Sequence, residues 1–151
     1  MQEKLIVKNK KASFDFEIRD TYEAGVILTG AEIKSVRSGK VQLRGSFVAI
    51  TPGGRAVAEN IHIGAYQPAN QPDYNPTRRR TLLLHKKEID QLSAAQNERG
   101  IAVIPMEIYL KKGLAKIRIG IGVGRKKYDK REVLKKRSQE KEIRKALKNR
   151  I

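Results

Sequence analysis

The thirty C-terminal residues, 122–151, constrain most strongly how this chain can fold. They carry 13 Lys and Arg against 4 Asp and Glu, which is +9 of the chain's total net charge of +17. Such a segment has too little apolar surface to form a core, and its like charges repel one another, although most of its residues favour helix. We therefore expect a compact body over residues 1–123. We expect residues 124–151 to be a basic tail that is disordered when free and helical when bound to a polyanion.

Composition narrows the classes of partner and site. Residues 1–121 have a net charge of 20 − 12 = +8, so the body is basic as well. A basic body with a basic tail favours a phosphate-rich partner, with anionic membrane and acidic protein as alternatives. The absence of cysteine excludes disulfides and thiolate metal sites, and no apolar stretch approaches 18 residues. We expect no metal, no cofactor, no signal peptide and no membrane span.

The apolar pattern predicts short strands. They are expected at residues 14–18, 22–28, two places within 41–60, 101–110 and 114–123, with turns at 52–54 and 111–113. Gly25 suggests a bulge in the second of these strands. Residues 1–12 are expected to be a flexible lead-in, and residues 64–80 a long loop.

Two helices are expected between the strands. Thr29 and Glu32 form a capping-box pattern before a short helix at 31–37, which Gly39 ends. A second helix is expected at 86–98. Because strands and helices do not alternate, the predicted class is all-β dominated: an antiparallel OB-type barrel with two or three short helices and a basic C-terminal tail.

The sequence contains no catalytic constellation. The glycines of the stretch 120–124 (GIGVG) lack a following Lys-Ser or Lys-Thr, so we interpret them as flexibility where the body ends. His62 alternates with Ile61 and Ile63, which is typical of a surface position on a strand. No two carboxylates are spaced as a paired acid and base. We expect that the protein is not an enzyme.

Basic residues gather at two places in the body. Lys34, Arg37 and Lys40 recur every third residue along the first helix and its exit, so they share one face. The run 78–80 (RRR) ends the long loop. Either group suits phosphate contact or a solvated surface equally well. Glu23, an acid on a basic body, suits a surface salt bridge, or it accepts hydrogen bonds from a base or a 2′-hydroxyl.

The tail has helical potential that its charge opposes. Asp129 and Glu132 repeat the capping-box spacing, and two favourable i,i+4 pairs follow, each worth about 0.2–0.5 kcal/mol. Two such pairs do not offset nine net positive charges. Tyr128 is the one aromatic residue of the tail, and with Lys127 and Lys130 beside it the ring suits stacking on an unpaired base.

Several segments, in chain order, resemble the SsrA-binding protein (SmpB) family. They are residues 9–12 (NKKA), 22–30 (YEAGVILTG), 32–37 (EIKSVR) with 39–40 (GK), 82–86 (LLLHK) and 126–132 (KKYDKRE). The resemblance implies a bacterial cytoplasmic protein with an OB-type barrel. Such a protein binds the tRNA-like domain of transfer-messenger RNA and delivers it to stalled ribosomes for trans-translation, with its tail probing the empty message channel.

The resemblance also implies the partners and the residues that meet them. The partners are transfer-messenger RNA, the small-subunit rRNA of the stalled 70S ribosome in the decoding centre and message channel, and elongation factor Tu through the alanyl-RNA. The protein is expected to be a monomer. By position, the family's RNA-binding residues are Asn9, Glu23, Leu83 and Lys116. Further candidates on the body are Lys10, Lys11, Lys34, Arg37, Lys40, Arg78, Arg80 and His85.

The tail carries a second set of candidates. For the decoding centre they are Lys126, Lys127, Tyr128, Asp129, Lys130 and Arg131. The chain departs from the family where Thr81, Val123 and Arg125 stand in place of a common Lys, which puts phosphate contacts at 81 and 123 in doubt. The alternative function is a structural ribosomal protein whose tail threads through rRNA. A membrane-bound tail is disfavoured because residues 124–151 contain no Trp or Phe.

Overall fold

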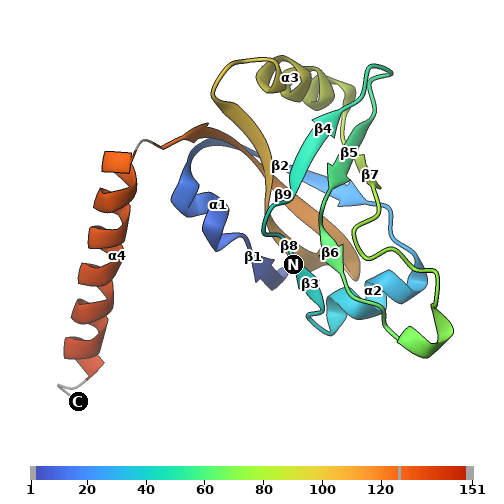
Figure 1. The fold of residues 1–151 in the computed structure, drawn as a ribbon, viewed down its shortest axis with the longest axis horizontal. Coiled ribbons are helices and arrows are strands. Elements are labelled where there is room, and N and C mark those ends of the chain that lie inside the picture. Colours follow the sequence, from blue (N-terminus) through green and yellow to red (C-terminus); the bar gives the residue numbers. More distant parts are fainter. Residues whose placement is uncertain (1–2, 126, 149–151) are drawn as a thin grey trace.

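The computed structural model describes residues 3–125 and 127–148, which form nine strands, four α-helices and one 3₁₀ helix (Figure 1). The strands are β1 (Glu3–Lys8), β2 (Phe16–Val26), β3 (Val41–Gln42), β4 (Phe47–Ile50), β5 (Ala56–Glu59), β6 (His62–Ile63), β7 (Arg80–Leu83), β8 (Ile101–Lys111) and β9 (Leu114–Gly124). The helices are α1 (Lys10–Asp15), α2 (Gly30–Arg37), η1 (Pro68–Asn70), α3 (Lys86–Gln96) and α4 (Lys127–Lys148).

Seven strands form one curled antiparallel sheet in the order β1-β8-β9-β2-β7-β5-β4, and β3 pairs with β6 in a separate two-stranded ribbon. Strands β1 and β4 lie at the two edges of the sheet, and no ladder between described residues joins them. The sheet curls enough to bring β4 close to β8. The result is the predicted OB-like architecture, as a barrel that is not closed. Three short helices, α1 to α3, accompany it, which agrees with the prediction of two or three.

The β8–β9 hairpin forms as its sequence predicts. Lys112 and Gly113 make the turn with φ of 54° and 76°. Along β9 the side chains of Ile117 and Ile119 are buried in the core, while Lys116 and Arg118 alternate with them on the opposite face. This alternation gives the sheet an apolar inner face and a charged outer face.

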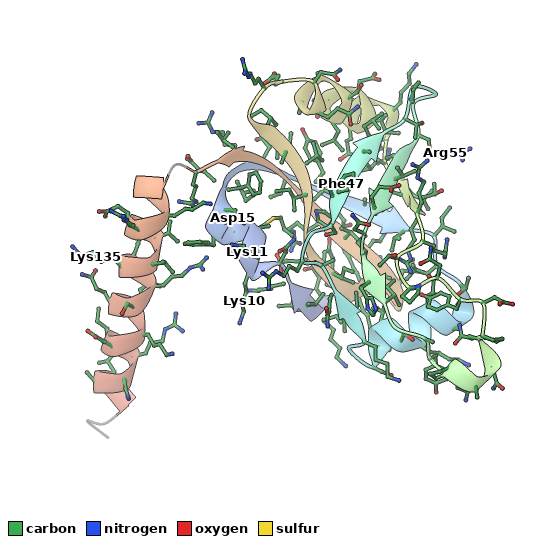
Figure 2. All side chains as sticks on the ribbon, in the orientation of Figure 1. Lys10, Lys11, Asp15, Phe47, Arg55 and Lys135 are labelled. Atoms are coloured by element: carbon green, nitrogen blue, oxygen red, sulfur yellow. The ribbon has the colours of Figure 1, made fainter. Side chains whose placement is uncertain are left out.

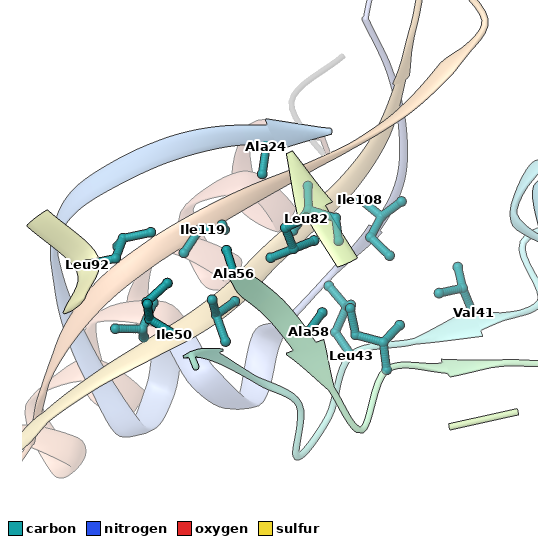
Figure 3. Packing of buried hydrophobic residues seen from close by; sticks show 14 of the residues in the cluster. Ala24, Val41, Leu43, Ile50, Ala56, Ala58, Leu82, Leu92, Ile108 and Ile119 are labelled. Carbon is teal, nitrogen blue, oxygen red and sulfur yellow. The ribbon is translucent and has the colours of Figure 1, made fainter. Parts of the chain in front are cut away.

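The core lies between the inner face of the curled sheet and α3. Leu92 of α3 has no exposed surface and belongs to the same cluster as Ala56, Leu82 and Ile119 (Figure 3). Each fully buried aliphatic side chain of this size contributes about 1.5–3 kcal/mol to folding. The core therefore holds the strands that carry the outer face in a fixed register.

Local sequence signals explain α2 and its ends. The Thr29 hydroxyl accepts from the backbone N–H of Glu32 at 3.2 Å, and the Glu32 carboxylate accepts from the N–H of Thr29 at 2.9 Å, so the predicted capping box is confirmed. Gly39, with φ of 78°, follows the helix where a left-handed residue is needed. At the start of α3, Glu88 likewise accepts from the backbone N–H of His85, the residue before the helix, at 3.1 Å.

One exposed edge of the sheet is covered by a side chain. Gln96, at the end of α3, accepts from the N–H of Ile50 at 2.9 Å and donates to its carbonyl at 3.0 Å. The amide thus makes the pair of hydrogen bonds that another strand would make to β4.

The N-terminal region differs from the sequence prediction. Residues 1–12 are not a flexible lead-in, because the described part forms β1, which pairs with β8, and the first half of α1. Phe14 lies in α1 rather than in a strand. The two strands expected at 14–18 and 22–28 are the single strand β2, which pairs with β9 along nearly its whole length. The register shift in β2 falls between Ile18 and Asp20 and not at Gly25.

The glycines at 120 and 122 are also reassigned. Both are buried inside β9, where a Cβ on Gly120 would stand 2.9 Å from Ile18 and one on Gly122 would stand 2.8 Å from Phe16. Real Cβ atoms do not approach so closely, so these glycines allow β2 to pack against β9. Flexibility at the end of the body is therefore the wrong interpretation for these two positions.

The tail is a helix beside the body. Helix α4 spans 22 residues, roughly 33 Å at the usual rise, and extends away from the barrel (Figure 1). Its apolar residues Leu134, Ile143 and Leu147 are 53, 60 and 57% exposed. Whether this helix melts in the free protein and forms on RNA stays a prediction. None of the described helices is long and apolar enough to cross a membrane.

Candidate nucleic-acid interface

The family resemblance implies that four residues of the body bind RNA. Three of them, Glu23, Leu83 and Lys116, converge on the outer face of the sheet. Strand β2 lies between β7 and β9, and Gly25 pairs with Leu83 on one side and with Lys116 on the other. Glu23 precedes Gly25 by two residues, so it shares that face. These four residues, Glu23, Gly25, Leu83 and Lys116, are called the sheet patch below.

Gly25 lets the two neighbouring side chains of the sheet patch approach each other. A Cβ at this position would lie 3.4 Å from Cβ of Leu83 and 3.7 Å from Nζ of Lys116. The ammonium of Lys116 therefore lies over the backbone of β2, next to Leu83, which is 59% exposed. A cation beside an uncovered apolar side chain suits a phosphate and the adjoining ribose or base.

Glu23 is held as an ionised acceptor. Tyr109 donates its hydroxyl to the Glu23 carboxylate, and Lys111 donates to both carboxylate oxygens at 3.3 Å. The hydrogen bond from Tyr109, followed by those from Lys111, outweighs partial burial and lowers the pKa of Glu23. Burial first, and then the bond to Glu23, raise the pKa of Tyr109, so its hydroxyl stays protonated and donates. Glu23 keeps 37% of its side chain exposed, which leaves room for a further donor.

A second layer of charges fixes Tyr109 in turn. The guanidinium of Arg118 lies 4.6 Å from the centroid of the Tyr109 ring and pairs with Glu107 at 3.2 Å and Glu3 at 3.4 Å. The charge of Arg118 is thus paired with carboxylates of the protein itself. Lys116, in contrast, has no carboxylate within salt-bridge distance among the described residues. The sequence contains no specific signal for this layer. Tyr109, Lys111 and Arg118 stood out there only by their alternating positions in two strands.

A separate basic surface lies on α2. Lys34, Arg37 and Lys40 are exposed, as the spacing predicts, and Nζ of Lys34 lies 5.5 Å from the centroid of the Tyr66 ring. Tyr66 is 37% exposed, and the sequence analysis missed it. An aromatic residue in a Pro-rich loop was the signal available. We call these four residues, Lys34, Arg37, Lys40 and Tyr66, the helix patch.

Arg80 is not available to RNA. It has no exposed surface, and its guanidinium donates to Glu32 Oε2 at 2.9 Å, to the Ile61 carbonyl at 2.7 Å and to the Tyr74 hydroxyl at 3.0 Å. Arg78 is partly exposed, but its guanidinium also pairs with Glu32. The assignment of Arg80 as a phosphate contact is therefore corrected, and Arg78 serves first as a structural partner of Glu32.

Glu32 is the shared acceptor of this buried cluster. Burial alone would raise the pKa of its carboxyl, but hydrogen bonds from Arg78, the Thr29 backbone and Arg80 outweigh burial and lower the pKa to about 2. The carboxylate joins α2 to β7 and, through Tyr74, to the long loop. The helix patch is consequently held at a fixed position against the sheet.

Asn9 also lies inside the protein. It is 5% exposed, donates to the carbonyls of Pro105 at 3.0 Å and Leu43 at 3.2 Å, and accepts from the N–H of Ala12 at 3.1 Å. Asn9 thus begins α1 and fixes it to β8, and any influence on RNA is indirect. Lys10 and Lys11 follow it on the exposed side of α1, and His85 is exposed two residues after Leu83.

The tail helix contacts the body through α1. Lys130 pairs with Asp15 at 3.3 Å, and Arg137 donates to the Ser13 hydroxyl at 3.0 Å (Figure 2 labels Asp15). Lys11 pairs with the same Asp15 oxygen at 3.3 Å. Burial would raise the pKa of Asp15, but hydrogen bonds from Lys130 and Lys11 lower it. Lys126 lies outside the described residues, as do the side chains of Lys127, Tyr128 and Asp129. Arg131 is exposed.

The OB-like sheet, its charged outer face and its basic helices define a small nucleic-acid-binding protein. No group of three metal-binding side chains occurs in the part of the chain that the structure describes. The family model described as SmpB protein matches residues 6–149. The chain therefore belongs to the SmpB family.

Curated relatives agree with this assignment. An SsrA-binding protein of Lactobacillus helveticus is 54% identical over 93% of this chain and 91% of its own, and one of Lactobacillus acidophilus is 52% identical over 95% and 94%. A solved chain described as "tmRNA-SmpB: a journey to the center of the bacterial ribosome" is 36% identical, with a TM-score of 0.68, over 85% of this chain and 93% of that one.

Proposed function

We propose that the protein binds the tRNA-like domain of transfer-messenger RNA and delivers it to stalled ribosomes for trans-translation. The observation that carries the proposal is the convergence of Glu23, Leu83 and Lys116 on one face of an OB-like sheet. Its context is a family whose relatives are named SsrA-binding proteins and whose solved member is described with tmRNA and the bacterial ribosome.

In this proposal the sheet patch recognises the RNA by three different chemistries. Lys116 meets a phosphate, Leu83 packs against an unstacked base or ribose, and Glu23 accepts from a base N–H or a 2′-hydroxyl. The helix patch adds phosphate contacts, with the Tyr66 ring available for stacking. No step requires bond chemistry, so we propose an adaptor rather than an enzyme.

The tail acts in a separate step. We place residues 124–151 in the message channel of the small subunit, with Tyr128 and the basic residues from 126 to 131 at the decoding centre. The exposed Leu134, Ile143 and Leu147 support this assignment, because the body leaves them uncovered. Phosphates of the channel would relieve the repulsion between the tail's charges, and messenger RNA would exclude it by occupying the same space.

The remaining assignments follow from this role. The protein acts as a monomer in the cytoplasm and meets elongation factor Tu only through the alanyl-RNA. Candidate body contacts beyond the two patches are Lys10, Lys11 and His85, all of them exposed. The alternative, a structural ribosomal protein, predicts no preference for a tRNA-like fold.

Competition binding tests the proposal. The tRNA-like domain of transfer-messenger RNA should displace a labelled copy of itself far better than a generic RNA duplex of equal length at physiological salt. Equal competition would leave only the salt-dependent attraction that any basic protein has for RNA, and would overturn the proposal.

Truncation after Gly124 tests the division between body and tail. The truncated protein should bind the tRNA-like domain nearly as well as the full chain but should not support peptide tagging on a ribosome stalled without a stop codon. Loss of RNA binding on truncation would show that recognition does not belong to the body.

A further inference from the structure

A groove of about 400 Å³ lies on the sheet outside both patches. It is lined by Thr51, Gly53, Arg55, Val57, Arg79 and Thr81. Its floor is made by paired residues, because Val57 of β5 lies opposite Thr81 of β7. Val57 is 1% exposed although it is absent from the core cluster, so its side chain is covered on the outer face by the walls of the groove.

The groove continues the sheet patch across β7. Thr81 and Leu83 are two residues apart on β7, so their side chains point to the same face. Arg55 precedes Val57 by two residues, so the antiparallel register brings it level with Leu83. A nucleic-acid strand that crosses the sheet from Lys116 over Leu83 therefore reaches the groove next.

Two guanidinium groups border the groove. Arg55 is exposed, has no ion-pair partner among residues 3–125 and 127–148, and projects from the side of the body away from α4 (Figure 2). Arg79 is 63% exposed and pairs with Glu59, itself at the end of β5. An exposed pair of this kind is weak and exchanges readily for a phosphate.

The walls add uncharged donors. The Thr51 hydroxyl accepts from the backbone N–H of Arg55 at 3.2 Å, which leaves its own hydrogen free to donate, and the hydroxyl of Thr81 lies on the floor. A guanidinium group binds two phosphate oxygens at once, and a hydroxyl donates a single hydrogen bond to a phosphate oxygen. The groove has no aromatic lining, so it suits a backbone phosphate better than a base.

We infer that this groove is a phosphate subsite for the RNA bound on the sheet patch, with Arg55 and Arg79 as its cations. The inference rests on the proposed function, because the phosphate belongs to that RNA. It assigns a role to Arg79, the exposed member of the run 78–80, and to Arg55, which carried no sequence signal.

The test measures binding of the fluorescein-labelled tRNA-like domain by anisotropy over a series of salt concentrations. Arg55→Ala and Arg79→Ala should each weaken binding by about three- to tenfold and reduce the slope of log K against log salt by about 0.7–0.9. Arg99→Ala removes another exposed arginine, in the turn after α3, and is the matched control. It should leave the slope unchanged.

A gain-of-charge variant provides an independent reading. Thr81→Lys places a new cation on the groove floor, so it should strengthen binding and should restore affinity to the Arg79→Ala protein. Thermal unfolding of each variant establishes that the fold is kept.

The outcomes separate the two claims. If the wild type prefers the tRNA-like domain but Arg55→Ala and Arg79→Ala behave like Arg99→Ala, the subsite is refuted and the proposed function stands. If the wild type shows no such preference, the proposed function fails and the subsite fails with it. If Thr81→Lys restores nothing, no phosphate passes over the groove floor.

Discussion

The hydroxyl of Tyr109 on β8 donates to the carboxylate of Glu23 on β2, across the intervening strand β9. This bond fixes the one acidic group of the sheet patch and keeps it ionised. The ring of Tyr109 is held separately by Arg118. A mutation can therefore remove the hydrogen bond that orients the Glu23 carboxylate without disturbing the packing of the Tyr109 ring.

Tyr109→Phe should weaken RNA binding without unfolding the protein. The ring stays under Arg118, but Glu23 loses the donor that orients it and its pKa rises. We expect a loss of affinity of about two- to tenfold for the tRNA-like domain, because only part of the energy of a hydrogen bond to a charged carboxylate, about 1.5–3 kcal/mol, bears on RNA binding. Anisotropy titration measures it, and unchanged affinity would show that Glu23 needs no orientation from Tyr109.

Gly122→Ala should destabilise the body by about 1–3 kcal/mol. Its Cβ would stand 2.8 Å from Cβ of Phe16 and 3.2 Å from Ile18, so β2 and β9 would have to separate. Gly25→Ala is the matched control, because its Cβ meets nothing closer than 3.4 Å. Urea unfolding of both variants measures the difference. Equal stabilities would contradict the role assigned to the buried glycine.

The Glu32 cluster should make stability depend on pH in the acid range. The pKa of Glu32 falls from its ordinary 4.5 to about 2 on folding, so its contribution is complete above pH 4.5 and is lost as the pH falls toward 2. The shift corresponds to roughly 3 kcal/mol. Unfolding free energies between these pH values should show this slope for the wild type.

Glu32→Gln should flatten that slope and also destabilise the protein at neutral pH by about 3–5 kcal/mol, since it leaves the buried Arg80 without its counter-charge. Glu98→Gln, at an exposed position after α3, is the control and should change neither property. A Glu32→Gln protein that keeps the wild-type acid slope would assign that slope to other carboxyls.

Asp15→Asn should loosen the tail helix from the body. The change removes the charge that Lys130 and Lys11 share, so the described part of α4 keeps the hydrogen bond from Arg137 to Ser13 and the contact of Lys130 with the Phe14 ring. Backbone amides of residues 130–148 should exchange hydrogen faster, while affinity for the tRNA-like domain should not change. Asp20→Asn, an exposed acid on β2, is the control. Unaltered exchange in α4 would show that Asp15 does not hold the tail.

The sequence predicts those parts of the fold that local signals determine. The capping box of Thr29 and Glu32 and the turn at Lys112 and Gly113 each act within a few residues, and both form as expected. Strand β1 depends instead on pairing with β8, about a hundred residues away in the chain. Its apolar run is only three residues long, and the charged residues Glu3, Lys4 and Lys8 flank it, so its sequence does not indicate a strand.

The run 78–80 begins a pattern from which the inward direction of Arg80 can be predicted. Arg80, Leu82 and Leu84 alternate with a period of two, and Leu82 is a core position. That period places Arg80 on the inner face and Arg79 on the outer one, as the structure does. The sequence alone does not indicate what would pair with a buried arginine there, because its partner, Glu32, is 48 residues away.

The amide of Gln96 on the edge of β4 affects whether copies of this cationic chain associate with one another. A sheet with a free edge invites another copy to add a strand, and adsorption on RNA concentrates many copies in one place. Gln96 occupies both the N–H and the carbonyl of Ile50, so these two groups at the end of β4 are not free to pair with a strand of another copy. Gln96 therefore hinders strand addition at the Ile50 end of β4, even where bound RNA neutralises the charge repulsion between copies.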